Sequence, residues 1–328
     1  MFSALTNEDA AIILKFSMIF MKLTLQALFL FSFIFSACKP NNRDEKDPPV
    51  IVKLPPVGAI NTANENSSGS KLSFDLRIPD QSWKLPKKLV EVSGNTWVDK
   101  SHLILIDDNY SSLFLVSIDD KKVELEKTID FGNKENKLDI EDVAIVDNIV
   151  YALSSHGILY KITDWNNKYT TEKITTFLSG KNDTEGLSYD PVTKSLLIAC
   201  KDESGLMDEK KSTKAVYRFN IDSKKLEEKP FLIIREDDFK KVTEDKVEFN
   251  PSAIAVHPET HEIYLLSTQD TKGMAIYDRD GKLISFQSID KDLMPQPEGI
   301  CFSPEGKLYI SSEGKKGDAA NLFAFNSK

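Results

Sequence analysis

Five positions in this chain, 44 to 67 residues apart, carry side chains that could bind a charged ligand together. They are Ser93, Glu141, Glu185, Ser252 and Glu298. Each is the second residue of a similar short phrase, such as the Pro-Glu-Gly-Ile phrase at residues 297–300. If the phrases are arranged around one axis, three glutamates converge there and repel each other unless a cation or protons intervene. Since Ca²⁺ prefers oxygen ligands, one hypothesis is a divalent cation held by Glu141, Glu185 and Glu298.

A structural role is the alternative for the same five positions. Each side chain could hydrogen-bond to the backbone of the neighbouring repeat and so hold the repeats together. Repeated residues in repeat proteins usually stabilise the contact between adjacent units. The sequence leaves both interpretations open.

A second group of polar side chains follows the second strand that we expect in each repeat. The candidates are Asp107, Lys201, Asp202 and Glu313. Loops that connect the strands of a rigid scaffold commonly form binding sites. Lys201 together with Glu185 and Glu313 would make a pocket of mixed charge. The alternative is a set of solvated turns.

The sequence does not decide whether the protein is an enzyme. It contains no Gly-Lys-Ser/Thr phosphate loop, no Gly-x-Ser-x-Gly elbow and no Cys-x-x-Cys pair. These motifs would have indicated nucleotide, serine-hydrolase or thiol chemistry. Its four histidines include His257 and His261, but Pro258 between them argues against the helix that a metal-binding pair needs.

The elements that must position these side chains are short strands. Runs of β-branched and aromatic residues alternate with turns rich in Asp, Asn, Gly and Pro. Repeats of about 45 residues with several strands each are typical of β-propeller blades. We predict an all-β, five-bladed propeller, with six blades as the alternative if the interval between Glu185 and Ser252 hides another. A short surface helix is expected at residues 236–242. The last blade lacks an outer strand, which an N-terminal strand at residues 71–76 would supply.

The first seventy residues predict export and a tether. Residues 1–37 have the pattern of a signal peptide, with translation expected to start at Met18 or Met21. The phrase Ser36-Ala37-Cys38 resembles a lipobox, which would make Cys38 the acylated first residue; an ordinary signal peptide is the alternative. Residues 38–70 are rich in Pro, Ser and Asn and predict an extended tether. The propeller would then occupy residues 71–328.

The composition limits the classes of partner that we expect the protein to bind. The net charge is −9 and there is no block of Lys and Arg, so we expect no nucleic-acid partner. After Cys38 the chain has only Cys200 and Cys301, which we expect to be buried thiols. We expect a monomer attached to the membrane through its lipid.

Several phrases resemble those of the SdiA-regulated family of bacterial membrane-associated β-propellers. The phrases near the C-terminal end of that family's sequences are matched by residues 297–300 and by the Leu-Tyr-Ile-Ser-Ser-Glu strand at residues 308–313. The phrase that opens the family's propeller sequence, Leu-Pro-x-x-Leu-x-Glu-x-Ser-Gly, is matched by Leu85, Pro86, Leu89, Glu91, Ser93 and Gly94. The resemblance implies a propeller, an envelope location and regulation by a quorum-sensing transcription factor. It implies no agreed enzymatic activity.

The combined prediction is a lipid-anchored envelope propeller that binds a small ligand or an envelope protein at its axial face. It would lie at the outer membrane and face the periplasm or the cell surface, with Ca²⁺ as the candidate cofactor. One alternative is a calcium-dependent hydrolase of the phosphoesterase or lactonase type. The other is a passive scaffold for protein partners.

Overall fold

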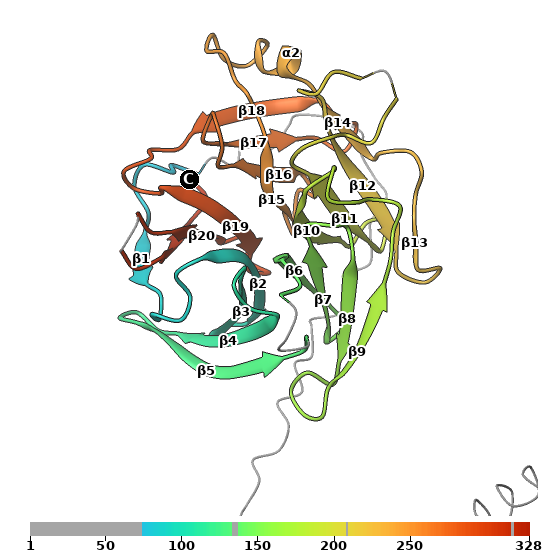
Figure 1. Cartoon of the computed structure of the whole chain (residues 1–328). Helices are drawn as coiled ribbons and strands as arrows, with labels where there is room; N and C mark the ends of the chain where they lie inside the picture. The colour runs from blue at the N-terminus through green and yellow to red at the C-terminus, as the bar shows by residue number, and fades with distance from the viewer. Residues whose placement is uncertain (1–73, 133–136, 208, 316–317) are drawn as a thin grey trace, which may run out of the picture. The chain divides into compact units, whose positions relative to one another are not determined.

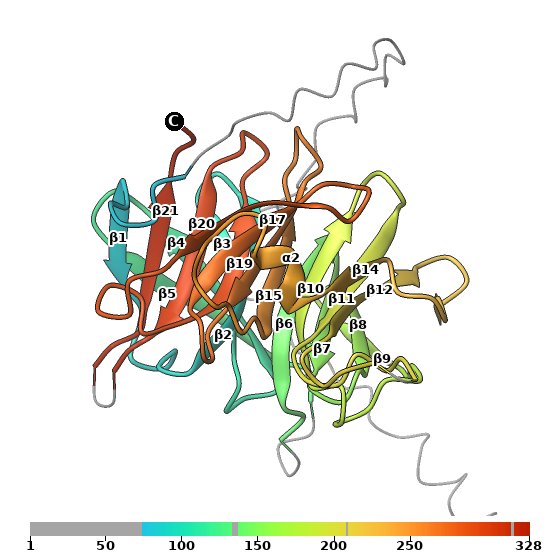
Figure 2. The ribbon, with the colours of Figure 1, turned by 90° about the horizontal axis from the view of Figure 1, so that it is seen from above.

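The apolar runs of this chain form five antiparallel sheets that surround a common axis (Figure 1). The computed structural model describes residues 74–132, 137–207, 209–315 and 318–328. Each sheet is one blade, and Figure 2 shows the blades from the side. The innermost strands of neighbouring blades contact one another all the way round, including the contact between the last blade and the first. The prediction of a five-bladed propeller is therefore confirmed.

Each blade begins with its innermost strand. Blade 1 contains β2 (Val92–Asp99), β3 (His102–Asp107), β4 (Ser112–Ile118) and β5 (Val123–Asp130). Blade 2 contains β6 (Ile140–Val146), β7 (Ile149–Ser154), β8 (Leu159–Thr163) and β9 (Thr170–Ile174). Blade 3 contains β10 (Thr184–Asp190), β11 (Ser195–Cys200), β12 (Lys214–Asn220), β13 (Lys225–Leu226) and β14 (Leu232–Ile234). Blade 4 contains β15 (Pro251–Val256), β16 (Ile263–Ser267), β17 (Gly273–Tyr277) and β18 (Leu283–Ser288).

Blade 5 combines the two ends of the described chain. It contains β19 (Gln296–Phe302), β20 (Leu308–Glu313), β21 (Asn321–Phe325) and β1 (Gln81–Lys84). Strand β1 pairs antiparallel with β21 and supplies the outer strand that the C-terminal repeat lacks. This pairing ties the first strand of the fold to the last and closes the ring.

The predicted closing strand at residues 71–76 was wrong in position. Phe74 and Leu76 are in no strand and instead pack into the hydrophobic cluster between blades 4 and 5. Residues 71–73 lie outside the described part. The strand begins at Gln81 because the segment from Gln81 to Lys84 buries only Trp83, which suits an outer strand with one covered face.

The hydrophobic core is divided among the five spaces between neighbouring blades. Each of the five clusters takes side chains from two adjacent blades. The middle strands are therefore covered on both faces, which explains why strands such as β11 and β16 are buried along their whole length. Cys200 and Cys301 are free and buried, as expected, and burial raises the pKa of the Cys200 thiol to about 12.

The described residues of the long interval before Ser252 form no sixth blade. It adds β13 and β14 to blade 3 and then the short helix α2 (Glu236–Phe239), which lies beside β18 at the rim (Figure 1). Phe239 of this helix is buried between blades 3 and 4. The expected surface helix is confirmed, and the six-bladed alternative is excluded.

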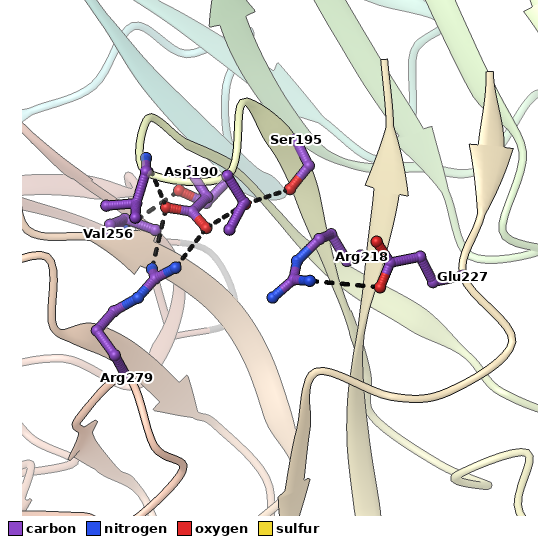
Figure 3. A network of polar contacts seen from close by, with 9 residues as sticks. Asp190, Ser195, Arg218, Glu227, Val256 and Arg279 are labelled. Carbon is purple, nitrogen blue, oxygen red and sulfur yellow. Dashed lines mark hydrogen bonds and ion pairs between the residues drawn. The ribbon is translucent and has the colours of Figure 1, made fainter. Parts of the chain in front are cut away.

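An ion pair links blades 3 and 4 on the side where the innermost strands end. Arg279 donates two hydrogen bonds to Asp190, of 3.0 and 2.8 Å (Figure 3). Thr193 donates a third, of 2.5 Å. Burial raises the pKa of Asp190, but these hydrogen bonds outweigh it, so the pKa lies below its usual value. This carboxylate therefore stays charged and holds the two blades in register.

The predicted signal peptide, Cys38 and the tether lie outside the described residues. Within the described residues, no helix is long and apolar enough to cross a membrane.

Candidate functional site

Each innermost strand contains a β-bulge at the position singled out in the sequence. The pairing with the second strand skips one residue in every blade, and the skipped residues are Ser93, Glu141, Glu185, Ser252 and Glu298. A bulged residue has no partner in the ladder, and the bulge redirects its side chain. The recurring phrase is thus the sequence of a bulge that five blades share.

The residue after the bulge lies very close to the next blade. A Cβ atom added at Gly94 would lie 2.7 Å from the Cα atom of Asp142 and 2.9 Å from the carbonyl oxygen of Glu141. No side chain fits at these distances. In blade 1, the crowding of the innermost strands near the axis therefore requires glycine at this position. Blade 2 has Asp142 there instead, and its carboxylate accepts the Leu187 N–H of blade 3.

The three bulge glutamates line one cavity at the axis, with a volume of about 420 Å³. Three more acidic side chains and two lysines line it as well: Asp108, Asp270, Glu313, Lys201 and Lys272. The remaining lining residues are Thr268, Gln269 and Gln296. The structure therefore brings Glu141, Glu185 and Glu298 together with Lys201 and Glu313, as the mixed-charge pocket requires.

The two serines of the ring connect blades instead of lining the cavity. The Ser93 hydroxyl donates to the Ile140 carbonyl at 3.2 Å, and the Ser252 hydroxyl donates to the Pro297 carbonyl at 2.9 Å. Both serines are buried. For these two positions, the structural alternative is the one that the structure shows.

Other polar links between blades also bypass the glutamates. Asp142 accepts the Leu187 N–H of blade 3 at 2.7 Å, and Asn95 donates to the Ser311 hydroxyl of blade 5 at 2.9 Å. Among the described residues, Glu141 and Glu298 accept no hydrogen bond, and Glu185 accepts one, from Lys201 at 2.5 Å. The glutamates therefore do not hold the blades together through backbone hydrogen bonds.

The cavity raises the pKa of its carboxyl groups. Burial, followed by repulsion from Glu185, raises the pKa of Glu141 to about 9. Burial raises the pKa of Glu185 to about 8 and that of Glu298 to about 7, although Lys201 opposes both shifts. Burial and then Glu298 raise the pKa of Glu313 to about 9. At neutral pH, Glu141 and Glu313 are therefore mostly protonated, whereas Glu298 is close to half ionised.

Three buried polar atoms in the cavity wall have no hydrogen-bond partner in the part of the chain that the structure describes. They are Oδ1 of Asp108, Oε2 of Glu185 and Oγ1 of Thr268, which come from three different blades. Buried polar atoms in folded proteins are nearly always satisfied. These atoms therefore provide hydrogen-bonding capacity that a ligand can use.

The register of the bulges identifies a second ring of residues around the cavity. In blades 1 to 4, the first residue beyond the pairing with the innermost strand is Asp108, Ser155, Lys201 or Thr268. The equivalent residue of blade 5 is Glu313, which still pairs with Gln296. All of them except Ser155 line the cavity. Ser155 instead donates to Asp139 at 2.6 Å.

Two pocket candidates from the sequence lie elsewhere. Asp107 is fully buried and accepts the N–H groups of Glu91 and Asn109 at 3.0 and 3.1 Å, so it shapes the turn after β3. Asp202 follows Lys201 but does not line the cavity. The sequence reasoning missed Thr268 and Lys272 and used Asp107 in place of Asp108. Alignment of the second strands on the bulge would have found Asp108 and Thr268.

The structure shows no preformed metal site. Within the described residues, no three His, Cys, Asp or Glu side chains are grouped closely enough to hold one ion. The oxygen donors suit Ca²⁺ chemically, but direct coordination by the three glutamates would require their side chains to move together.

Comparison with known proteins identifies the family. The SdiA-regulated family model matches residues 68–316. This chain belongs to the SdiA-regulated family. No curated protein matches its sequence.

Solved structures with a similar fold share little sequence with this SdiA-regulated protein. A glutaminyl cyclase from Myxococcus xanthus is 14% identical, with a TM-score of 0.50 over 76% of this chain and 96% of that chain. A gluconolactonase from Xanthomonas campestris is 11% identical, with a TM-score of 0.45 over 73% of each chain. A virginiamycin B lyase from Staphylococcus aureus is 13% identical, with a TM-score of 0.41 over 75% and 73%. At these identities, the likeness concerns the fold alone.

Proposed function

We propose that this SdiA-regulated protein is a monomeric envelope lipoprotein, anchored through Cys38, whose propeller binds a positively charged ligand in the axial cavity. The observation that carries the proposal is that a buried carboxyl group of the cavity lacks a hydrogen-bond partner. Glu185 is only 7% exposed, and its Oε2 has no partner among the described residues. An ionised carboxylate only accepts hydrogen bonds, so a ligand that satisfies it must bring donors or a cation.

The surplus of acidic groups over lysines in the cavity supports a positive ligand, which would favour their ionised forms. Six acidic side chains and two lysines line it, and both lysines already have partners. Lys201 donates to Glu185, and Lys272 donates to the Thr268 carbonyl. A bound cation would relieve the repulsion that raises the pKa of Glu141 and would displace protons from the cavity.

Calcium is the first cation to test, because the cavity offers carboxylate, hydroxyl and amide oxygens. Thermal melts of the purified full chain, with EDTA and with added Ca²⁺, test this directly. Binding to the folded state must raise the melting temperature, by an amount that grows with ligand concentration. We expect Ca²⁺ to raise it and Glu298→Gln to reduce the increase, whereas Glu124→Gln on the exposed outer strand β5 serves as the control. If neither EDTA nor Ca²⁺ moves the melting temperature, calcium is not a ligand.

Hydrolysis is a second candidate function, because burial, opposed by the charge of Lys201, raises the pKa of Glu298 to about 7. A carboxyl group that titrates near the working pH suits general acid–base catalysis. Hydrolysis of a phosphate monoester or a lactone in the presence of Ca²⁺ should then be lost in Glu298→Gln. A cation-stabilised protein that hydrolyses neither substrate would favour binding without catalysis.

A passive scaffold accounts less well for the cavity. It predicts ring side chains that are satisfied internally, whereas the buried Oε2 of Glu185 has no partner among the described residues. The large exposed apolar side chains include Ile78, Phe177 and Met207, which belong to different blades or loops.

A further inference from the structure

We propose that the ligand of the axial cavity is a small aliphatic amine whose ammonium group is bound by the carboxylates of blades 1, 2 and 5. This inference rests on the proposed function, since it names the class of positive ligand that the cavity takes. It differs from the calcium hypothesis in requiring an organic cation of several atoms.

The distribution of the acceptors favours an extended ligand over a single ion. A bound Ca²⁺ collects six to eight oxygens at about 2.3–2.6 Å, and the described residues contain no such group of acidic side chains. The acceptors come from several blades around a cavity of about 420 Å³, within the range that small organic ligands occupy. An ammonium donates at about 2.7–2.9 Å to each carboxylate, and a short carbon chain lets its contacts lie apart.

The position of the unpaired carboxyl groups indicates where the ammonium lies. On blades 3 and 4, Lys201 and Lys272 are already engaged. On blades 2 and 5, Glu141 and Glu298 accept no hydrogen bond from described residues. On blade 1, Oδ1 of Asp108 is buried without a partner, while its Oδ2 lies 3.7 Å from Lys137. The cavity carboxyl groups that accept no hydrogen bond among the described residues therefore form a sector of blades 5, 1 and 2, which are neighbours in the ring. Blade 3 adds only the free Oε2 of Glu185.

The same side chains discriminate against other ligands. An anion would face this carboxylate sector, which costs energy through like-charge repulsion. A neutral alcohol could accept hydrogen bonds from the protonated carboxyl groups. It would not compensate their negative charge when they ionise. An ammonium donates three hydrogen bonds to ionised carboxylates and carries the positive charge that compensates them.

Isothermal titration of the full chain with three probes tests the inference. The probes are 1,4-diaminobutane, the matched neutral diol 1,4-butanediol, and CaCl₂. We expect the diamine to bind and the diol not to bind. Binding at pH 7 should also release protons, because ammonium binding favours ionised Glu141 and Glu298. The measured enthalpy should then depend on the ionisation enthalpy of the buffer.

Variants locate the site. Glu141→Gln and Glu298→Gln should each weaken diamine binding at least tenfold, since each removes a charge-assisted acceptor. Glu124→Gln, on the outer surface of blade 1, should leave it unchanged. Equal binding of diamine and diol, or diamine binding that both cavity variants retain, would overturn the inference.

The outcomes also separate this inference from the proposed function. If CaCl₂ binds and the diamine does not, the cavity takes a cation but not an amine, and only the inference is wrong. If neither cation binds, both the inference and the proposed function are wrong. If the diamine binds and depends on Glu141 and Glu298, both stand.

Discussion

Replacing Glu141 by Gln should make this propeller more stable at neutral and alkaline pH. Burial raises the pKa of Glu141 from 4.5 to about 9, so the folded state binds a proton that the unfolded state releases. For a carboxyl group with a raised pKa, the stability present at low pH is lost as the pH rises from 4.5 towards 9. Glutamine keeps the shape and has no charge to develop.

The magnitude follows from the same pKa. Each pH unit between the two pKa values is worth about 1.4 kcal/mol, which sets an upper limit of about 3 kcal/mol at pH 7. Glu141 retains some exposure to solvent, and solvent screening reduces the effect, so we expect a gain of about 2 kcal/mol. For a domain of this size, that gain corresponds to an increase of roughly 5 °C in the melting temperature.

Urea denaturation at pH 5, 7 and 9 measures this effect. The variant should gain more stability at pH 9 than at pH 5. The adjacent Asp142 provides a control of opposite sign, because it accepts the buried N–H groups of Leu187 and Val143. Asp142→Ala should lower the free energy of unfolding by about 2 kcal/mol. A Glu141→Gln variant less stable than the parent, or with unchanged pH dependence, would refute the reasoning and favour a structural role for the glutamate.

Three further changes have expected outcomes. Lys201→Met removes the only described partner of Glu185, so the pKa of Glu185 should rise above 8 and urea denaturation at pH 8 should show a lower stability than in the parent. Arg279→Ala leaves the fully buried Asp190 without its cationic partner and should cost about 3 kcal/mol in the same measurement; a loss below 1 kcal/mol would show that the ion pair does not hold blades 3 and 4. Cys38→Ser should move the expressed protein from the membrane fraction to the soluble fraction, and retention in the membrane would contradict lipid anchoring.

The repeat pattern predicted most of the architecture. Phrases such as Thr-Glu-Gly-Leu at residues 184–187 recur because every blade needs the same bulge where the innermost strands crowd at the axis. Local requirements of this kind are visible in a sequence. The closing strand was harder to predict, since both residues 71–76 and β1 (Gln81–Lys84) can form a strand locally. Only the space between blades 4 and 5, which Phe74 and Leu76 fill, decided between them.

The candidate site was predicted in part. The three glutamates were identified from their types and spacing, and the structure places them in one cavity with Lys201 and Glu313. Asp107 was preferred to Asp108 because the sequence does not show which of two adjacent aspartates lies beyond the last ladder pair. Strand pairing sets that register: Asp107 faces Val92, and Asp108 is left to line the cavity.

The sequence by itself favoured five blades, indicated the family and marked the five positions at which the bulges lie, because these depend on residue types that recur along the chain. The tertiary structure decided which of the ring residues connect blades and which remain unpaired. Ser93 and Ser252 are short enough to hydrogen-bond to the adjacent backbone, whereas the longer side chains of Glu141, Glu185 and Glu298 line the cavity. That division depends on distances between blades that lie far apart in the sequence.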